Sequence, residues 1–202
     1  MDITDLLPVI QQRRSVRRYA SEPVPNELLE TLLQAAVWAP SAHNRQPWRF
    51  AVLQSCAQKG QFAAAMGERL RADRLAAGDP PETVAEDVER SRQSLMQAPV
   101  LLLCCMSMED MDRSPDARRA QAERTMAIQS VALAAQNILL AAHAAGLGAC
   151  WRCAPLFCPD TAREILQLPA DWEPQALITI GYPAETGSPP ERRSLADVVQ
   201  WI

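Results

Sequence analysis

Histidine is scarce in this chain: His43 and His143 are the only two among its 202 residues. A histidine-rich metal centre would need more ligands of this type. Neither histidine lies in a G-x-S-x-G hydrolase motif, and we expect His143 to be a satisfied core or interface residue. From the sequence we therefore assign no metal ligand and no catalytic side chain.

A dinucleotide-binding fingerprint is missing too. Gly146 and Gly148 lack the third glycine of that motif, and they follow an expected helix where the motif would follow a strand. The sequence thus predicts no Rossmann site for NAD(P)H.

An excess of positive charge is also lacking, since 20 basic and 24 acidic residues give a formal net charge of −4. This balance argues against a nucleic-acid binder. No basic and apolar leader is apparent at the N-terminus, so we expect a cytoplasmic protein whose six cysteines are reduced thiols. With no linker or repeat, residues 1–202 are expected to form one domain.

The longest apolar stretch, residues 120–151, is expected to contain the central helix of the fold. It opens polar and is then almost entirely apolar and small from Met126 to Ala145. No face of this helix is fully polar, so it should be buried nearly all round, in the core or at a subunit interface. Polar residues such as Gln136 interrupt it, which argues against a membrane span. Gly146 and Gly148 are expected to end it.

The other expected elements follow from hydrophobic periodicity and from helix-breaking residues. Helices are expected from Thr4 or Asp5 through Ile10, from Asn26 until Pro40, in two pieces of 57–97 with the second starting near Thr83, and over 160–168. Strands are expected over 48–53, 100–106 and 176–182, the second of them buried on both faces. The charged segment 107–123 is expected to be a surface loop, suited to act as a lid over a site.

Four arginines and a serine lie close together at 13–18, where the sequence is Arg-Arg-Ser-Val-Arg-Arg. Guanidinium groups can surround a phosphate with charge-assisted hydrogen bonds. The alternative is a solvated face at the end of a helix. A nucleic-acid patch is disfavoured, because no interleaved aromatic residues accompany the arginines.

Two further segments could carry chemistry. The loop 39–48 is dense in hydrogen-bonding groups and could bind the edge of a planar polar ligand, or it could simply connect a helix to a strand. Cys150, Cys153 and Cys158 form the other segment. A metal site is disfavoured, because it normally needs four ligands and the nearest further cysteines, Cys104 and Cys105, lie in an expected buried strand. A redox Cys-x-x-Cys pair is disfavoured too, because we do not expect this segment at the start of a helix after a strand.

The Arg-Arg-Ser-Val-Arg-Arg-Tyr run at 13–19, paired with Ala-Pro-Ser-Ala-His-Asn-Arg-Gln-Pro-Trp at 39–48, resembles the signature of the FMN-dependent nitroreductase family. The segments 146–151 and 178–183 also resemble landmarks of that family, in the family's order, so the resemblance covers nearly the whole chain. In detail, 154–159 and 168–177 are most similar to the nitroreductase-like domain of the ligase that makes the deazaflavin coenzyme.

The resemblance implies an α+β fold in which helices surround a central, mainly antiparallel sheet, with the long helix at a homodimer interface. It also implies bound FMN. The residues that would hold the phosphate are Arg13, Arg14, Ser15 and Arg17, with Arg192 and Arg193 closing on it. The residues that would approach the ring and ribityl chain from the partner subunit are Pro40, Ser41, Ala42, Asn44 and Gln46, while Ala154 and Leu156 are candidate backbone donors to the ring.

The implied activity is that of an FMN-dependent NAD(P)H oxidoreductase. Because no separate dinucleotide site is expected, the nicotinamide donor would enter the flavin pocket, pass hydride to FMN and leave before the acceptor binds. The acceptor would be flat and electron-poor, of nitroaromatic or quinone type. The alternatives are a reductase step in deazaflavin coenzyme biosynthesis and a flavin-binding module without turnover.

Overall fold

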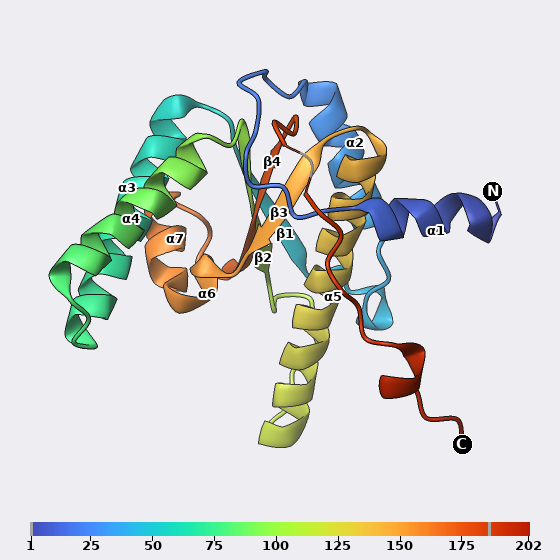
Figure 1. The fold of residues 1–202 in the computed structure, drawn as a ribbon. Helices are drawn as coiled ribbons and strands as arrows, with labels where there is room; N and C mark the ends of the chain where they lie inside the picture. The colour runs from blue at the N-terminus through green and yellow to red at the C-terminus, as the bar shows by residue number, and fades with distance from the viewer. Residues whose placement is uncertain (1, 186) are drawn as a thin grey trace.

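The computed structural model describes residues 2–185 and 187–202 and is built on one antiparallel sheet (Figure 1). The sheet has the strand order β1-β2-β4-β3. Its strands are β1 (Trp48–Leu53), β2 (Val100–Met106), β3 (Gly148–Arg152) and β4 (Glu173–Gly181). The expected antiparallel sheet is therefore confirmed, with one strand, β3, that the sequence did not predict. β4 begins three residues earlier than expected.

Strand β2 is one of the two inner strands of the sheet, and every one of its residues is buried, as the sequence predicted. It pairs with β1 on one side and with β4 on the other. Alternate side chains point to opposite faces, so Leu102 belongs to one core cluster while Leu101 and Leu103 belong to the other.

Seven α-helices and two short 3₁₀ helices surround the sheet in the part of the chain described. Their bounds are α1 (Ile3–Gln12), α2 (Asn26–Val37), α3 (Cys56–Ala76), α4 (Pro81–Met96), α5 (Ala117–Ala144), α6 (Ala154–Phe157) and α7 (Pro159–Ile165), with η1 (Ala42–Asn44) and η2 (Leu195–Asp197). Helices α2 and α5 pack on one face of the sheet, and α3, α4 and α7 cover the other (Figure 1).

Several helix boundaries differ from the prediction. Helix α1 follows Asp2, whose N–H donates to the Asp5 side chain at 3.0 Å, so it starts before Thr4. Helix α4 begins at Pro81, because proline is tolerated in the first helical turn. Helix α5 takes in 117–123, which the sequence assigned to a loop, and the Asp116 side chain caps it by accepting the Arg119 N–H at 2.8 Å.

A single chain buries only part of the surface of α5. Within one chain it is buried along one stripe, whose members are Ala127, Ser130, Val131, Ala134, Ala135, Ile138, Leu139 and Ala142. Its other face carries exposed apolar side chains, with Ile128 38% and Leu133 45% exposed. The helix is long and apolar enough to pass a length-and-composition test for a membrane span. Its buried stripe packs against α2 and the sheet, as a core helix does.

The two glycines after α5 have different roles. Gly146 has a φ of +76° and ends the helix, as expected. Gly148 instead opens β3, and a Cβ placed there would lie 2.7 Å from the Cβ of Val16. Glycine at 148 therefore lets the N-terminal segment lie directly against the strand.

Replacing Gly148 by alanine should lower the free energy of unfolding by about 1–3 kcal/mol, the usual cost of forcing extra volume into a packed site. The matched control is Gly60→Ala in α3, where an added Cβ meets nothing within 4 Å. That control should be neutral or gain up to about 1 kcal/mol. Urea unfolding of both variants checks this, and equal stabilities would show that the Val16 contact is unimportant.

Candidate functional site

The arginine segment is held on the sheet by backbone hydrogen bonds. The N–H of Val16 donates to the Ala149 carbonyl at 3.1 Å, and the N–H of Ala20 donates to the Tyr182 carbonyl at 2.9 Å. Since Ala149 lies in β3 and Tyr182 directly follows β4, these bonds fix the segment at one end of these two strands. Arg17 and Arg18 lie between these two bonds, and Arg13 and Arg14 lie just before them, so the arginines project from or beside an anchored backbone.

Tyr19 fastens the same segment through its side chain. Its hydroxyl lies 2.5 Å from the Val16 carbonyl and 2.7 Å from Oγ1 of Thr179 in β4. Burial disfavours the phenolate and raises the pKa of Tyr19 to about 12. The neutral hydroxyl thus remains a hydrogen-bond donor well above neutral pH.

The arginines line an open hollow of about 390 Å³ together with the C-terminal tail. Its lining residues are Arg13, Arg14, Ser15, Arg17, Glu185, Gly187, Ser188, Pro190 and Arg192. Five of the six predicted phosphate-binding residues therefore come together, and Arg193 is not among the residues that line the hollow. Sequence reasoning missed Glu185, Gly187 and Ser188, because isolated small or acidic residues in a tail give no pattern.

The charge of this hollow is strongly positive, with four guanidinium groups against the single carboxylate of Glu185. The Glu185 carboxylate lies 3.6 Å from Arg18, a residue that does not line the hollow. The Nη1 of Arg14 donates to the Gln11 and Arg13 carbonyls at 2.6 and 2.8 Å, while its Nε is buried without a partner in the described chain. An anion with several acceptor oxygens fits such a site.

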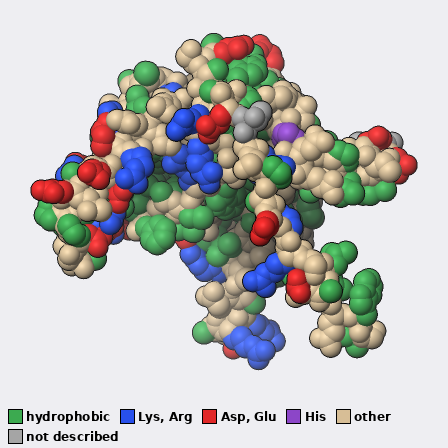
Figure 2. All heavy atoms as spheres, viewed as in Figure 1, with side chains coloured by type: hydrophobic (Ala, Val, Ile, Leu, Met, Phe, Trp, Pro, Cys, Tyr) green, Lys and Arg blue, Asp and Glu red, His purple; other side chains and the backbone are tan. Residues whose placement is uncertain are grey.

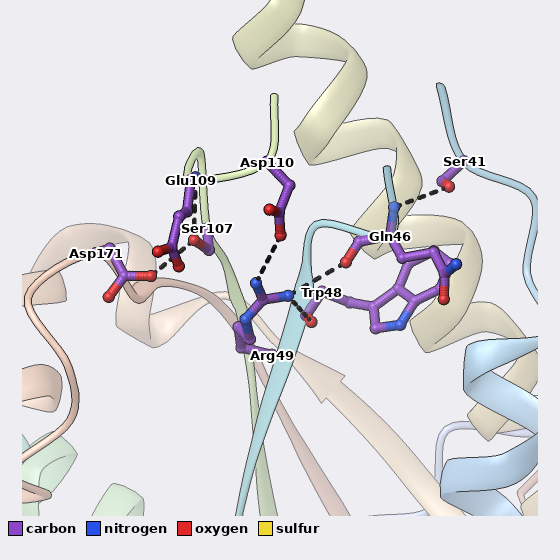
Figure 3. Close-up of polar contacts among 8 residues, drawn as sticks. All are labelled: Ser41, Gln46, Trp48, Arg49, Ser107, Glu109, Asp110 and Asp171. Carbon is purple, nitrogen blue, oxygen red and sulfur yellow. Dashed lines mark hydrogen bonds and ion pairs between the residues drawn. The ribbon is translucent and has the colours of Figure 1, made fainter. Parts of the chain in front are cut away.

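The polar loop 40–47 has a strained backbone. His43, Asn44 and Gln46 all have positive φ, at 48°, 54° and 49°. Such conformations are costly for non-glycine residues and cluster at functional sites. The Gln46 N–H donates to Oγ of Ser41 at 3.1 Å, which stabilises the turn (Figure 3).

The same loop is anchored to α5 and leaves its amide side chains exposed. The Ala42 N–H donates to Oγ of Ser130 at 3.4 Å. Asn44 and Gln46 are exposed, with 3.4 Å between Gln46 Nε2 and Asn44 Oδ1, and Pro40 is exposed as well. None of the predicted loop residues lines the arginine hollow.

Arg49 connects this loop to the segment after β2, a contact that sequence reasoning missed. Its Nη1 donates to the Gln46 and Trp48 carbonyls at 3.2 and 3.0 Å, and its Nη2 lies 3.3 Å from Asp110 (Figure 3). In the same segment, Oγ of Ser107 lies 2.7 Å from Asp171. These contacts tie residues 107–110 to the loop and to the turn before β4.

Ala154 and Leu156 lie in α6, directly after β3. The Leu156 N–H already donates to the Cys153 carbonyl at 3.0 Å, so Ala154 is the better placed of the two to meet a ligand. Ala154 also lines a second, mainly apolar hollow of about 110 Å³ between α3, α4 and α6.

In Figure 2, basic side chains gather at the middle of the molecule, above an apolar recess.

The cysteines make separate contacts. Sγ of Cys153 accepts from Trp151 Nε1 at 3.2 Å, whereas Sγ of Cys158 lies 3.5 Å from the sulfur of Met66. Burial raises the pKa of Cys158 and holds that of Cys105 at about 12. Buried thiols of this kind are poor nucleophiles at neutral pH.

Together these features define an α+β protein with a positively charged hollow at one edge of an antiparallel sheet and a strained polar loop at the other. The chain belongs to the nitroreductase family, whose family model matches residues 10–182. Its fold is the nitroreductase-like fold, as the sequence resemblance implied.

Three relatives illustrate the similarity. An NADH dehydrogenase of Thermus thermophilus is 36% identical, covering 100% of this chain and 98% of that protein. A 5,6-dimethylbenzimidazole synthase of Rhodospirillum rubrum is 32% identical over 93% of this chain and 86% of its own length. A nitroreductase structure from Desulfovibrio desulfuricans, in complex with FMN, has a TM-score of 0.75 and 30% identity, covering 98% of this chain and 96% of that one.

Replacing Tyr19 by phenylalanine should lower the free energy of unfolding by about 1–2 kcal/mol at neutral pH, because the Val16 carbonyl and Thr179 lose a buried partner. The pKa of Tyr19 is raised from an unfolded value of about 10, so the stability it contributes is full below about pH 10 and is lost as the pH rises toward 12. Urea unfolding from about pH 9 to 11.5 should therefore show a steeper decline for the wild type than for Tyr19→Phe. Parallel declines would mean that Tyr19 is not the responsible group.

Proposed function

We propose that this chain is an FMN-dependent oxidoreductase that passes hydride from NAD(P)H to a flat, electron-poor acceptor of nitroaromatic or quinone type. The observation that carries the proposal is the arginine hollow, because it fits the phosphate of FMN. Membership in the nitroreductase family supports it, as do a relative named NADH dehydrogenase and a relative solved with FMN.

The residues of the hollow fit a phosphate group. Arg13, Arg17 and Arg192 offer planar donor groups, and Ser15 adds a hydroxyl. The buried Nε of Arg14 is a donor without a partner in the described residues, and such a group is costly unless a ligand satisfies it. These side chains would hold the phosphate, with Arg193 close in sequence to the same site.

The distance between the two predicted parts of the flavin site supports a site shared by two subunits. The loop 40–47 precedes β1, whereas the hollow lies beside the start of β3, and these are the two edge strands of the sheet. The register also puts Trp48 and Gly148 at opposite ends, because Trp48 pairs with Met106 while Gly148 pairs with Gly181. The loop and the hollow are therefore separated by three strand spacings of about 4.8 Å across the sheet and by the length of a strand along it. Together these distances exceed what one flavin can span.

We therefore infer a homodimer in which Pro40, Ser41, Ala42, Asn44 and Gln46 of one subunit face the phosphate site of the other. The exposed apolar face of α5 supports this pairing, and so does α1, none of whose residues is buried. Figure 1 shows α1 and the C-terminal tail extending away from the sheet, as arms that embrace a partner would. Such a dimer would contain two flavin sites.

FMN supplies the hydride chemistry when it is bound, and the chain's part is to bind, orient and exclude water. The arginine hollow fixes the phosphate end. Ala154 and the partner's loop would confine the ring, leaving one pocket for donor and acceptor in turn. Donor and acceptor must both be planar enough to use that pocket, which is the basis for the proposed acceptor class. The proposed use of NAD(P)H is consistent with the cytoplasmic location that we expect.

The purified protein should be yellow and should release FMN, identified by mass, on denaturation. Arg13→Ala should weaken FMN binding by about 1–3 kcal/mol, the scale of a charged hydrogen bond. Arg18→Ala is the matched control, since Arg18 lies in the same run outside the hollow and pairs with Glu185. A colourless protein that FMN cannot reconstitute would contradict the proposal.

Anaerobic stopped-flow mixing with NADH or NADPH should bleach the flavin, and a nitroarene or a quinone should then restore its colour. Reoxidation only by the unsaturated deazaflavin precursor would favour a role in deazaflavin coenzyme biosynthesis. Absence of reduction by either nicotinamide would reject the oxidoreductase and leave a flavin-binding module without turnover.

Leu133→Glu should convert the dimer to a monomer in light scattering and reduce FMN retention, because a charge would be buried in the α5 interface. The matched control is Leu75→Glu, since Leu75 is 43% exposed on α3, close to the 45% of Leu133. A flavin-loaded monomer of the wild type would refute the shared site.

A further inference from the structure

Arg152 is a partly buried cation that the phosphate hollow does not use. It ends β3, and its Nη2 donates to Oγ of Ser94 in α4. Its Nε is buried and has no hydrogen-bond partner within residues 2–185 and 187–202. No carboxylate of those residues forms an ion pair with it. Asp73, the acidic residue of the adjoining hollow, binds Arg69 at 2.8 Å.

Such an arrangement is costly unless something compensates for it. Removing a cation from water costs several kcal/mol when no partner repays it. A structural tie between β3 and α4 would need only a neutral donor to Ser94. The free charge and the unsatisfied Nε of Arg152 therefore point to an acceptor that the chain itself does not provide.

Arg152 lies beside a residue that we expect to meet the flavin ring. Ala154, the candidate for contact with the ring, lines the same hollow as Arg152. Arg152 and Arg17 both act on Tyr19, where each cation lowers the pKa against the larger effect of burial. Arg17 belongs to the phosphate hollow and Arg152 to the hollow that Ala154 lines, so Tyr19 lies within electrostatic range of one cation from each.

We propose that Arg152 tunes the flavin by stabilising the negative charge that the ring gains on reduction. This inference rests on the proposed function. The hydride transferred from NAD(P)H carries two electrons and a charge of −1, NAD(P)⁺ leaves, and no proton accompanies the transfer. Arginine stays protonated in proteins, so Arg152 acts by its charge and not by giving a proton. Charge beside the ring is one of the means by which a protein sets flavin electronics.

The test compares variants that separate charge from structure. Arg152→Gln keeps a hydrogen-bond donor for Ser94 and removes the charge, Arg152→Lys keeps the charge, and Ser94→Ala removes the tie alone. Arg90→Met is the matched control, because Arg90 is an exposed arginine on α4, the helix that carries Ser94, and is paired with Asp87 at 2.9 Å. Each variant is loaded with FMN, and its midpoint potential is measured against a reference dye together with the Kd for oxidised FMN.

Arg152→Gln should lose tenfold to a hundredfold of the preference for reduced over oxidised flavin, which is a fall in potential of about 30–60 mV for a two-electron couple. Its Kd for oxidised FMN should change far less. Arg152→Lys should have a midpoint potential close to that of the wild type. Ser94→Ala and Arg90→Met should have the wild-type midpoint potential.

An unchanged potential in FMN-loaded Arg152→Gln would overturn this inference and leave the proposed function standing. An equal fall in Ser94→Ala would also overturn it, because the tie to α4 would then be the cause. If Arg152→Gln does not fold, the potential of Arg152→Lys decides: a value near that of the wild type supports the charge, and a fall as large as that expected for Gln opposes it. A wild type that binds no FMN would instead refute the proposed function.

Discussion

The close contact between the N-terminal arginine segment and the strands β3 and β4 is the constraint on which the site depends. Backbone bonds from Val16 and Ala20, and the buried hydroxyl of Tyr19, hold this segment in place. The contact is possible only because Gly148 has no side chain. Flexible arginines are thereby attached to a rigid backbone, which reduces the entropy lost when they surround an anion.

The sheet topology imposes the second constraint, because the two halves of the proposed flavin site lie at opposite edges. Each subunit would contribute a phosphate site from the β3 edge and a ring-facing loop from the β1 edge. The positive φ angles of His43, Asn44 and Gln46 fit this role, since strain held by surrounding contacts keeps a loop in one shape. Dimerisation and cofactor binding would then be coupled.

Much of the fold followed from the sequence because long periodic elements carry strong signals. The buried strand Val100–Met106 was recognisable in this way. The site segments at 13–17 and 40–46 instead stood out by their arginines and hydrogen-bonding groups and by the family resemblance. β3 was missed because its five residues begin with a glycine that resembled a helix stop. Within one chain α5 is buried along one stripe only, because composition does not tell a core contact from a face that a second subunit would cover. Contacts such as Arg49–Asp110 and Arg152–Ser94 join residues far apart in sequence and leave no local pattern.

The most direct measurement of the central claim is a comparison of FMN and riboflavin, which share the ring and differ in the phosphate. If the arginine hollow binds the phosphate, FMN should bind at least about 100-fold more tightly, the effect of two charged hydrogen bonds. The difference should shrink as salt is added, because the hollow is open to solvent. Equal affinities for the two flavins would contradict the account.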